Sequence, residues 1–302
     1  MLERFVLRKN CVAVALVLML SLAGCGGAGG SGGGSANVLP SSAPSPIASS
    51  GATPQYVGYW DDWEQTPWSA VPRGVTTLIY AFDFVAGHSV VPDGNSPGYL
   101  TAAAVAALHQ RGIKVLLSLG GGSPSTAFVF DGDTKDFETN LISVLQQYGF
   151  DGVDFDDESG TQAQRVAALE SLIPATRAAF TANGIGNDLI TLAAFDTPTS
   201  FGDGTVLAAP GVAGALSWVN VMSYDYTAAQ SDLASFALVF PPAQLMLGSD
   251  IDGDVPIPSN ATLESLAAWV KNNGYGGMMV WTVNDATVAQ NQAIENGLTT
   301  GK

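Results

Sequence analysis

From residue 55 onward, hydrophobic and polar positions divide the chain into alternating short and long segments. The short segments are continuous apolar runs rich in Val, Ile, Leu and aromatic residues, and the long ones are Ala-rich or amphipathic. The first pattern predicts buried β-strands and the second predicts helices. The predicted strands are 55–60, 76–84, 114–119, one within 148–160, 189–195, 217–223, 244–248 and 277–281. The predicted helices are 101–111, 134–147, 162–183, 261–273 and 285–296.

The alternation of strands and helices is typical of a parallel sheet whose strands are joined by helical crossovers. About eight strand–helix units in about 245 residues match the size of a compact (β/α)8 barrel. We therefore expect an α/β fold, a single TIM barrel over residues 55–302. The spacing leaves no room for a second domain.

The segment before this domain has the pattern of an export signal. Residues 1–9 are basic, and residues 11–22 form an apolar run too short to span a bilayer comfortably. This order predicts a signal peptide over residues 1–24. The run ends in LAGC, which resembles the lipobox of bacterial lipoproteins and implies that Cys25 becomes the lipidated first residue. An ordinary secretory signal with an incidental cysteine is the alternative.

Residues 25–54 predict a flexible tether, because they are Gly, Ser, Ala and Pro with almost no charge. About 28 residues of coil reach on the order of 30 Å, enough to hold a globular domain clear of a membrane. We expect the protein in the bacterial cell envelope, held to the membrane by its lipid anchor, with the domain of residues 55–302 outside the cytoplasm. The other cysteine, Cys11, would leave with the signal, so no disulfide is expected.

The net charge restricts the possible partners. It is −16 for the 302 residues, and near −18 without residues 1–24, where 8 basic residues stand against 26 acidic ones. Such a chain repels nucleic acid and anionic lipid headgroups. A neutral or partly cationic polymer remains compatible, and we expect no nucleic-acid partner.

The acidic segment 148–160, YGFDGVDFDDESG, carries the main candidate chemistry. Alternate side chains of a strand share a face, so Asp154, Asp156 and Glu158 lie together and the apolar Val and Phe lie opposite. Three carboxylates on one face repel one another and are costly to desolvate. The pattern favours a solvated catalytic cavity. A solvated acidic edge would hardly alternate with Val and Phe, and a cation site usually brings carbonyls and turns.

Residues 151–158, DGVDFDDE, resemble the D-G-x-D-x-D-x-E motif of glycoside hydrolase family 18 at every fixed position. This family contains chitinases and endo-β-N-acetylglucosaminidases. The resemblance implies a (β/α)8 barrel with the motif on its fourth strand. Two further segments are similar to family motifs, 118–121 to S-x-G-G and 222–225 to M-x-Y-D.

The resemblance implies substrate-assisted catalysis, in which Glu158 protonates the glycosidic oxygen and the substrate's 2-acetamido oxygen attacks the anomeric carbon. Asp156 would accept a hydrogen bond from the acetamido N–H, and Asp154 behind it would share a proton with it. Tyr224 would donate to the acetamido oxygen, and Asp225 would line the same subsite. Neither a cofactor nor a metal is implied.

The sugar is expected to lie against aromatic and glycine residues at the ends of strands. The resemblance implies that Trp281 forms the floor of the cleavage subsite, with Phe82, Gly120 and Gly121 beside the substrate. It also implies non-proline cis peptide bonds after Ala81 and after Trp281.

The first loop gathers Trp60, Trp63 and Trp68, and we expect at least one of them to stack on a sugar ring. Trp60 and Trp63 are the residues that we expect to bind the substrate. Covering the end of the barrel is the alternative. Only a short loop follows the seventh predicted strand, so the α+β insertion domain of many processive family members is expected to be absent. The resulting open groove suits internal cuts in a β-1,4-linked N-acetylglucosamine chain, so we expect chitin or its oligomers as the substrate. We expect the protein to act as a monomer.

Two other functions stay open. Asp157 precedes the acid where chitinases commonly have Trp, and this is closer to endo-β-N-acetylglucosaminidases that cut the N-glycan core. A catalytically silent glycan-binding barrel is the second alternative, although the acid and the aspartates of the motif are all in place. The chain has only two histidines, His88 and His109, so we expect neither a Ser-His-Asp triad nor a His-ligated metal.

Overall fold

The computed structural model describes residues 54–61, 63, 66–92, 101–122, 127–195, 203–253 and 255–302. The predicted signal peptide, Cys25 and the tether up to residue 53 lie outside the described residues. Among the residues that are described, no helix combines the length and the hydropathy needed to cross a membrane.

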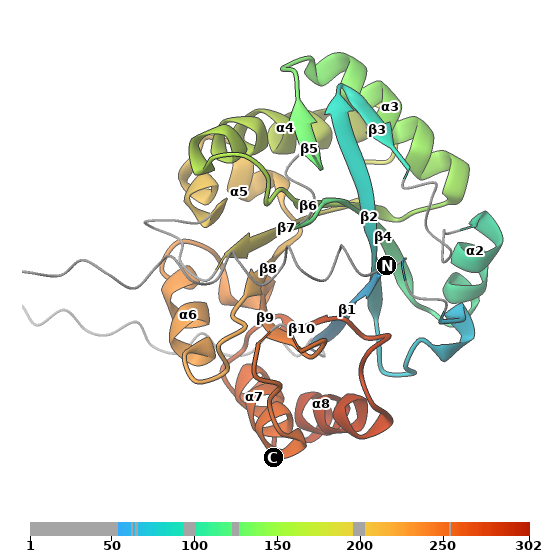
Figure 1. Cartoon of the computed structure of the whole chain (residues 1–302). Coiled ribbons are helices and arrows are strands. Elements are labelled where there is room, and N and C mark those ends of the chain that lie inside the picture. Colours follow the sequence, from blue (N-terminus) through green and yellow to red (C-terminus); the bar gives the residue numbers. More distant parts are fainter. Residues whose placement is uncertain are drawn as a thin grey trace, which may run out of the picture. The chain divides into compact units, whose positions relative to one another are not determined.

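Eight parallel strands form a closed ring, which confirms the predicted TIM barrel. The strands, in ring order, are β1 (Gln55–Asp61), β2 (Thr77–Gly87), β4 (Lys114–Gly120), β6 (Gly152–Asp156), β7 (Leu189–Phe195), β8 (Trp218–Met222), β9 (Leu245–Asp250) and β10 (Gly277–Trp281). The ring closes because β1 pairs with both β2 and β10. Figure 1 views it along the axis, with the helices arranged around the outside.

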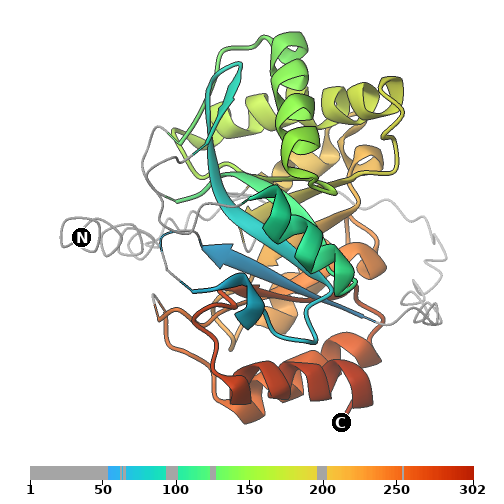
Figure 2. The same cartoon turned by 90° about the vertical axis from the view of Figure 1, so that its right-hand side faces the viewer.

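The helices are α2 (Ala102–Gln110), α3 (Thr134–Tyr148), α4 (Gln162–Ala182), α5 (Val212–Ala215), α6 (Ala229–Phe236), α7 (Asn260–Asn272) and α8 (Val288–Thr300). Figure 2 shows the barrel from the side, with α8 at the C-terminal end of the chain. Between β9 and α7, the described residues contain no further helix or strand. An α+β insertion domain after β9 is therefore not evident among these residues.

Alternation along each strand separates the barrel interior from the layer beneath the helices. In β10, Met278 and Val280 belong to a large cluster that also contains helix residues, so they face outward. Met279 and Trp281 belong to a second cluster, which is made of strand-end and interior residues. Since side chains of a strand alternate with a period of two, seven of the ring strands contribute one set to each cluster. The exception is β6, whose apolar residues face outward while Asp154 and Asp156 face the interior. The inward set near the carboxyl ends of the strands forms the site.

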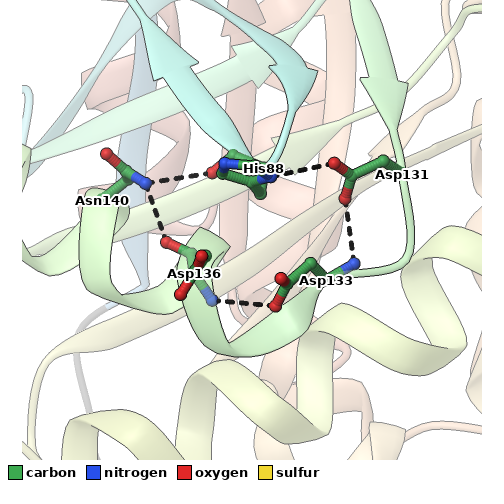
Figure 3. Close-up of polar contacts among 5 residues, drawn as sticks. All are labelled: His88, Asp131, Asp133, Asp136 and Asn140. Carbon is green, nitrogen blue, oxygen red and sulfur yellow. Dashed lines mark hydrogen bonds and ion pairs between the residues drawn. The ribbon is translucent and has the colours of Figure 1, made fainter.

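A small lobe continues from the ring beyond β2. There β2 pairs with β3 (Ser89–Val91) in an antiparallel hairpin and with β5 (Phe128–Phe130) in parallel. Figure 3 shows how the hairpin is attached to α3: the His88 Nδ1 lies 2.9 Å from the Asp131 Oδ2, and the Asn140 side chain donates to the His88 carbonyl at 3.4 Å. The lobe also contacts the loop after β6, because the Ser159 hydroxyl donates to the Phe128 carbonyl of β5 at 2.8 Å.

The structure differs from the sequence-based expectation at several boundaries. Strand β6 ends at Asp156, so Glu158 lies in the following loop and not on the strand itself. The last helix starts at 288 and not at 285, because Thr287 caps it in a reciprocal pair of hydrogen bonds with Gln290. Helices α5 and α6 and the short strands β3 and β5 were not predicted.

Candidate active site

The buried Asp154 is the lowest member of the acidic row and is held by donors from four other strands. Its Oδ2 accepts hydrogen bonds from Tyr59 and Ser118, both at 2.8 Å, and its Oδ1 accepts from Thr191 and from Asn220. Burial raises the pKa of the Asp154 carboxyl, although these four hydrogen bonds oppose the increase. Asp154 is thus fixed in the barrel interior with both oxygens engaged.

Asp156 lies one level above Asp154, against the glycine segment that follows β4. Its carbonyl accepts a hydrogen bond of 2.7 Å from the Gly121 N–H. A Cβ on Gly120 would lie 2.3 Å from that same carbonyl oxygen, and a Cβ on Gly121 would lie 2.6 Å from the Phe82 ring. Both glycines also have positive φ, +116° and +85°. The predicted Gly120 and Gly121 are therefore at the site because no side chain fits there.

The loop after β6 presents Glu158 through a turn made by its two neighbours. The Asp157 Oδ1 accepts from the Ser159 N–H at 3.0 Å, and the Ser159 hydroxyl lies 2.8 Å from both this oxygen and the Phe128 carbonyl of β5. Asp157 and Ser159 are buried, whereas Glu158 is partly exposed. The Glu158 carboxylate lies beside Gly122, where a Cβ would be 3.1 Å from its Oε1. The sequence analysis did not identify this turn.

Tyr224 follows β8 and faces the acidic row. Burial raises its pKa well above the ordinary value, and the charges of Asp156, Glu158, Asp250 and Asp252 raise it further. The phenol therefore stays protonated and can donate a hydrogen bond. Two of these carboxylates, Asp250 of β9 and Asp252 of the following loop, were not predicted to lie near Tyr224. The carboxylates near Tyr224 thus come from both β6 and β9.

Asp225 directly follows Tyr224 and lies in the turn after β8. It is exposed, and its Oδ1 accepts hydrogen bonds from the Thr227 N–H and hydroxyl at 2.9 and 2.7 Å. These bonds lower the pKa of Asp225. Asp225 therefore closes the turn after β8, and its place in the subsite of Tyr224 stays a prediction.

Aromatic rings surround the Trp281 indole at the end of β10. Its ring centroid lies 5.5 Å from that of Phe82, 5.6 Å from that of Tyr59 and 6.0 Å from that of Trp63. The peptide bonds Ala81–Phe82 and Trp281–Thr282 are both cis, as the family resemblance implied. Trp281, Phe82 and Trp63 therefore lie together above the interior residue Tyr59, which is bonded to Asp154.

Trp60 lies on the opposite side of β1, and the prediction that it contacts a sugar is wrong. Its side chain is 1% exposed and belongs to the cluster beneath the helices. It stacks on Trp68 with ring centroids 5.0 Å apart, and Trp68 in turn packs near Tyr80 at 6.1 Å. Because Tyr59 points into the barrel, its neighbour Trp60 must point out. Only Trp63 of the three first-loop tryptophans joins the site.

Most of the barrel matches one protein family. Residues 55–251 match the family described as Glycosyl hydrolases family 18. The chain belongs to this family. The match contains the acidic motif and Tyr224, whereas Trp281 lies beyond it.

Several proteins named as chitinases resemble parts of this family 18 chain. It is 26% identical over 179 residues to a class V chitinase of Arabidopsis thaliana, covering 56% of this chain and 47% of that protein. It is 31% identical over 136 residues to a chitinase of Enterococcus faecalis, covering 40% of this chain and 38% of that protein. The chain thus spans less than half the length of these curated relatives.

Solved structures show the same fold. The class V chitinase from Nicotiana tobaccum superposes with a TM-score of 0.69 at 16% identity, over 82% of this chain and 100% of that chain. The putative chitinase A from Streptomyces coelicolor superposes with a TM-score of 0.63 at 20% identity, over 82% of this chain and 98% of that chain. At these identities the likeness establishes the barrel fold.

Proposed function

We propose that this family 18 chain is a retaining glycosidase that cleaves β-1,4 bonds between N-acetylglucosamine units by substrate-assisted catalysis. The observation that carries the proposal is one arrangement at the carboxyl ends of the strands. The partly exposed Glu158 lies beside the glycine segment and within the electrostatic reach of a protonated Tyr224. The buried Asp154 and Asp156 lie beneath it, and the aromatic cluster around Trp281 lies at the same end of the barrel.

In the proposed first step, Glu158 transfers its proton to the glycosidic oxygen as the bond to the anomeric carbon breaks. The carbonyl oxygen of the substrate's 2-acetamido group forms a new bond to that carbon and gives an oxazolinium ion. Asp156 accepts a hydrogen bond from the acetamido N–H and stabilises the positive charge, while Tyr224 donates to the acetamido oxygen. In the second step, Glu158 removes a proton from water, which opens the oxazolinium and restores the original anomeric configuration.

The different surroundings of Asp154 and Asp156 support different roles for the two carboxylates. Asp154 is held on both oxygens by the hydroxyls and the amide around it, so its side chain stays in place. Asp156 sits one level nearer the solvent-facing end, where the substrate would enter. We assign the charge stabilisation to Asp156, with Asp154 supporting it from below through a carboxyl whose pKa burial has raised.

Chitin or its oligomers are the proposed substrate. Curated relatives of 26–31% identity over the matched segments are named as chitinases. The residue that pointed to the N-glycan core, Asp157, is buried in the turn with Ser159. Since no insertion domain is evident among the described residues, we expect an open groove that suits internal cuts in soluble chains.

The test compares soluble chitin oligomers with a high-mannose glycoprotein, using the wild type and Glu158→Gln. Shortened oligomers from the wild type, with the β-anomer formed first in proton NMR spectra, support the proposal. Glu158→Gln should be slower by about 10³-fold or more, because its amide cannot supply the proton. Release of intact glycan with the oligomers untouched would assign the N-glycan core instead. Tight oligomer binding without any cleavage would assign a binding protein.

We also propose that residues 1–24 are a lipoprotein signal, that Cys25 carries the lipid, and that residues 55–302 act as a monomer at the bacterial cell envelope. The support is the LAGC sequence after an apolar run and the Gly/Ser/Pro-rich tether. Two or more acyl chains give lasting attachment where a single chain does not. Cys25→Ser should leave the protein soluble or unprocessed. An unmodified Cys25 by mass spectrometry in a wholly soluble wild type contradicts the anchor, and sedimentation checks the monomer.

A further inference from the structure

The loop after β9 is joined to β10 at the aromatic pocket. Asp250 is the register partner of Trp281, and the Ile251 N–H donates to the Trp281 carbonyl at 2.7 Å. The Asp250 Oδ1 accepts from the Asp252 N–H at 3.0 Å, which fixes the first turn of the loop. The Asp252 Oδ2 then accepts a hydrogen bond of 2.8 Å from the Trp281 Nε1–H. Backbone and side-chain bonds thus place Asp252 at the edge of the indole.

This hydrogen bond acts on the one polar atom of the Trp281 side chain. The indole is 9% exposed, and its faces and edges contact Tyr59, Phe82 and Trp63. Ring contacts of this kind tolerate several tilts, because they depend weakly on direction. A hydrogen bond to a carboxylate is directional and stronger than one to a neutral acceptor. Asp252 is therefore the group that selects one rotation of the indole.

We propose that Asp252 is a positioning residue, which fixes the plane of the Trp281 indole and thereby sets how well the pocket binds the sugar ring next to Glu158. This inference rests on the proposed glycosidase function. It is not part of the family motif, since Asp252 lies one residue beyond the segment that matches family 18. A sugar ring stacks well only on an aromatic plane parallel to it, so a tilt of the indole weakens the contact before and during the reaction alike.

The test uses two single variants at the loop, one at the ring and one double variant. Asp252→Ala removes the acceptor and should raise KM for chitin oligomers about tenfold while kcat changes less than about twofold. Asp252→Asn keeps an oxygen acceptor without the charge and should restore KM to within about threefold of the wild type. In a Trp281→Phe background, which lacks the N–H donor, Asp252→Ala should add nothing further.

The matched control is Glu170→Ala, which removes one exposed carboxylate from α4, on the outside of the barrel. It should leave KM and kcat unchanged, which separates positioning from a change in net charge. Equal losses in Asp252→Asn and Asp252→Ala, or additive effects with Trp281→Phe, would overturn the proposal.

A second readout does not depend on activity. Near-ultraviolet circular dichroism of the free protein reports how rigidly tryptophans are held, and Asp252→Ala should lose part of the signal that Trp281→Phe also loses. A wild-type spectrum for Asp252→Ala overturns the positioning role. A wild type that neither binds nor cleaves chitin oligomers refutes the proposed function, yet the spectra still decide whether Asp252 holds the indole.

Discussion

Glu138 offers a quantitative test of how burial acts on this fold. It lies in α3, is 6% exposed, and accepts a hydrogen bond of 2.8 Å from the Thr176 hydroxyl of α4 at its Oε1. Its Oε2 is buried without a hydrogen-bond partner among the described atoms. Burial raises the pKa of Glu138 from 4.5 to about 7, and the Thr176 bond offsets only part of this shift. The carboxyl is thus protonated in the folded protein where it is ionised in the unfolded chain.

The sign and size of the effect on stability follow from this difference. Below about pH 4.5, Glu138 is protonated in both states and contributes no pH dependence. Between pH 4.5 and about 7, the unfolded chain binds fewer protons than the folded protein, so the free energy of unfolding falls as pH rises. A shift from 4.5 to about 7, at about 1.4 kcal/mol per pH unit, corresponds to a loss of about 3 kcal/mol above pH 7.

Glu138→Gln should remove this loss, because the amide cannot ionise and its oxygen can still accept from Thr176. Urea denaturation of both proteins at pH 5 and pH 8 should show the variant gaining about 2 to 3 kcal/mol relative to the wild type between the two conditions. Glu170→Gln, at an exposed position of α4, should change by less than about 0.5 kcal/mol. A Glu138→Gln effect that is the same at both pH values would refute the reasoning.

Three further predictions concern the site and the lobe. Glu158→Gln should keep the melting temperature while kcat falls by about 10³-fold or more; an active variant in a kinetic assay contradicts the assignment of the acid. Gly121→Ala should unfold at lower temperature than Gly112→Ala in calorimetry and lose activity. Both glycines have positive φ, but an added Cβ lies 2.6 Å from the Phe82 ring at Gly121 and has nothing within 4 Å at Gly112. Equal melting temperatures would argue against close packing at Gly121. The His88 pKa, raised by the hydrogen bond to Asp131, should lie above 6.5 by NMR and fall toward it in Asp131→Asn; an unchanged titration excludes the contact.

The periodic parts of the fold were predictable from the sequence. Seven of the eight barrel strands are largely apolar runs, and β6 alternates apolar with acidic residues. The predicted limits of β7 and β10 coincide with those in the structure. Helix α6 was missed because it is short, and β3 and β5 were missed because three-residue strands carry no periodic signal. The start of α8 depended on a cap formed by Thr287, which the apolar pattern does not reveal.

The sequence predicts the acidic residues of the site but not the residues that bind them. Spacing alone places Asp154 and Asp156 on one face, and the motif identifies Glu158 two residues further on. Their immediate surroundings come from residues distant in the chain. Asp154 is bonded to Tyr59, 95 positions away, and to Asn220, 66 positions away.

What the sequence by itself determined is therefore local: the strand and helix order, the family motif, and which residues of a strand share a face. Only the tertiary structure decided which face of β1 lies inside, and hence that Trp60 is buried beneath the helices while Tyr59 reaches Asp154. It also decided that Asp252 meets the indole of Trp281. The physical reason is that alternation has a period of two within each strand, whereas the choice of interior face and the neighbours across it arise when the ring closes.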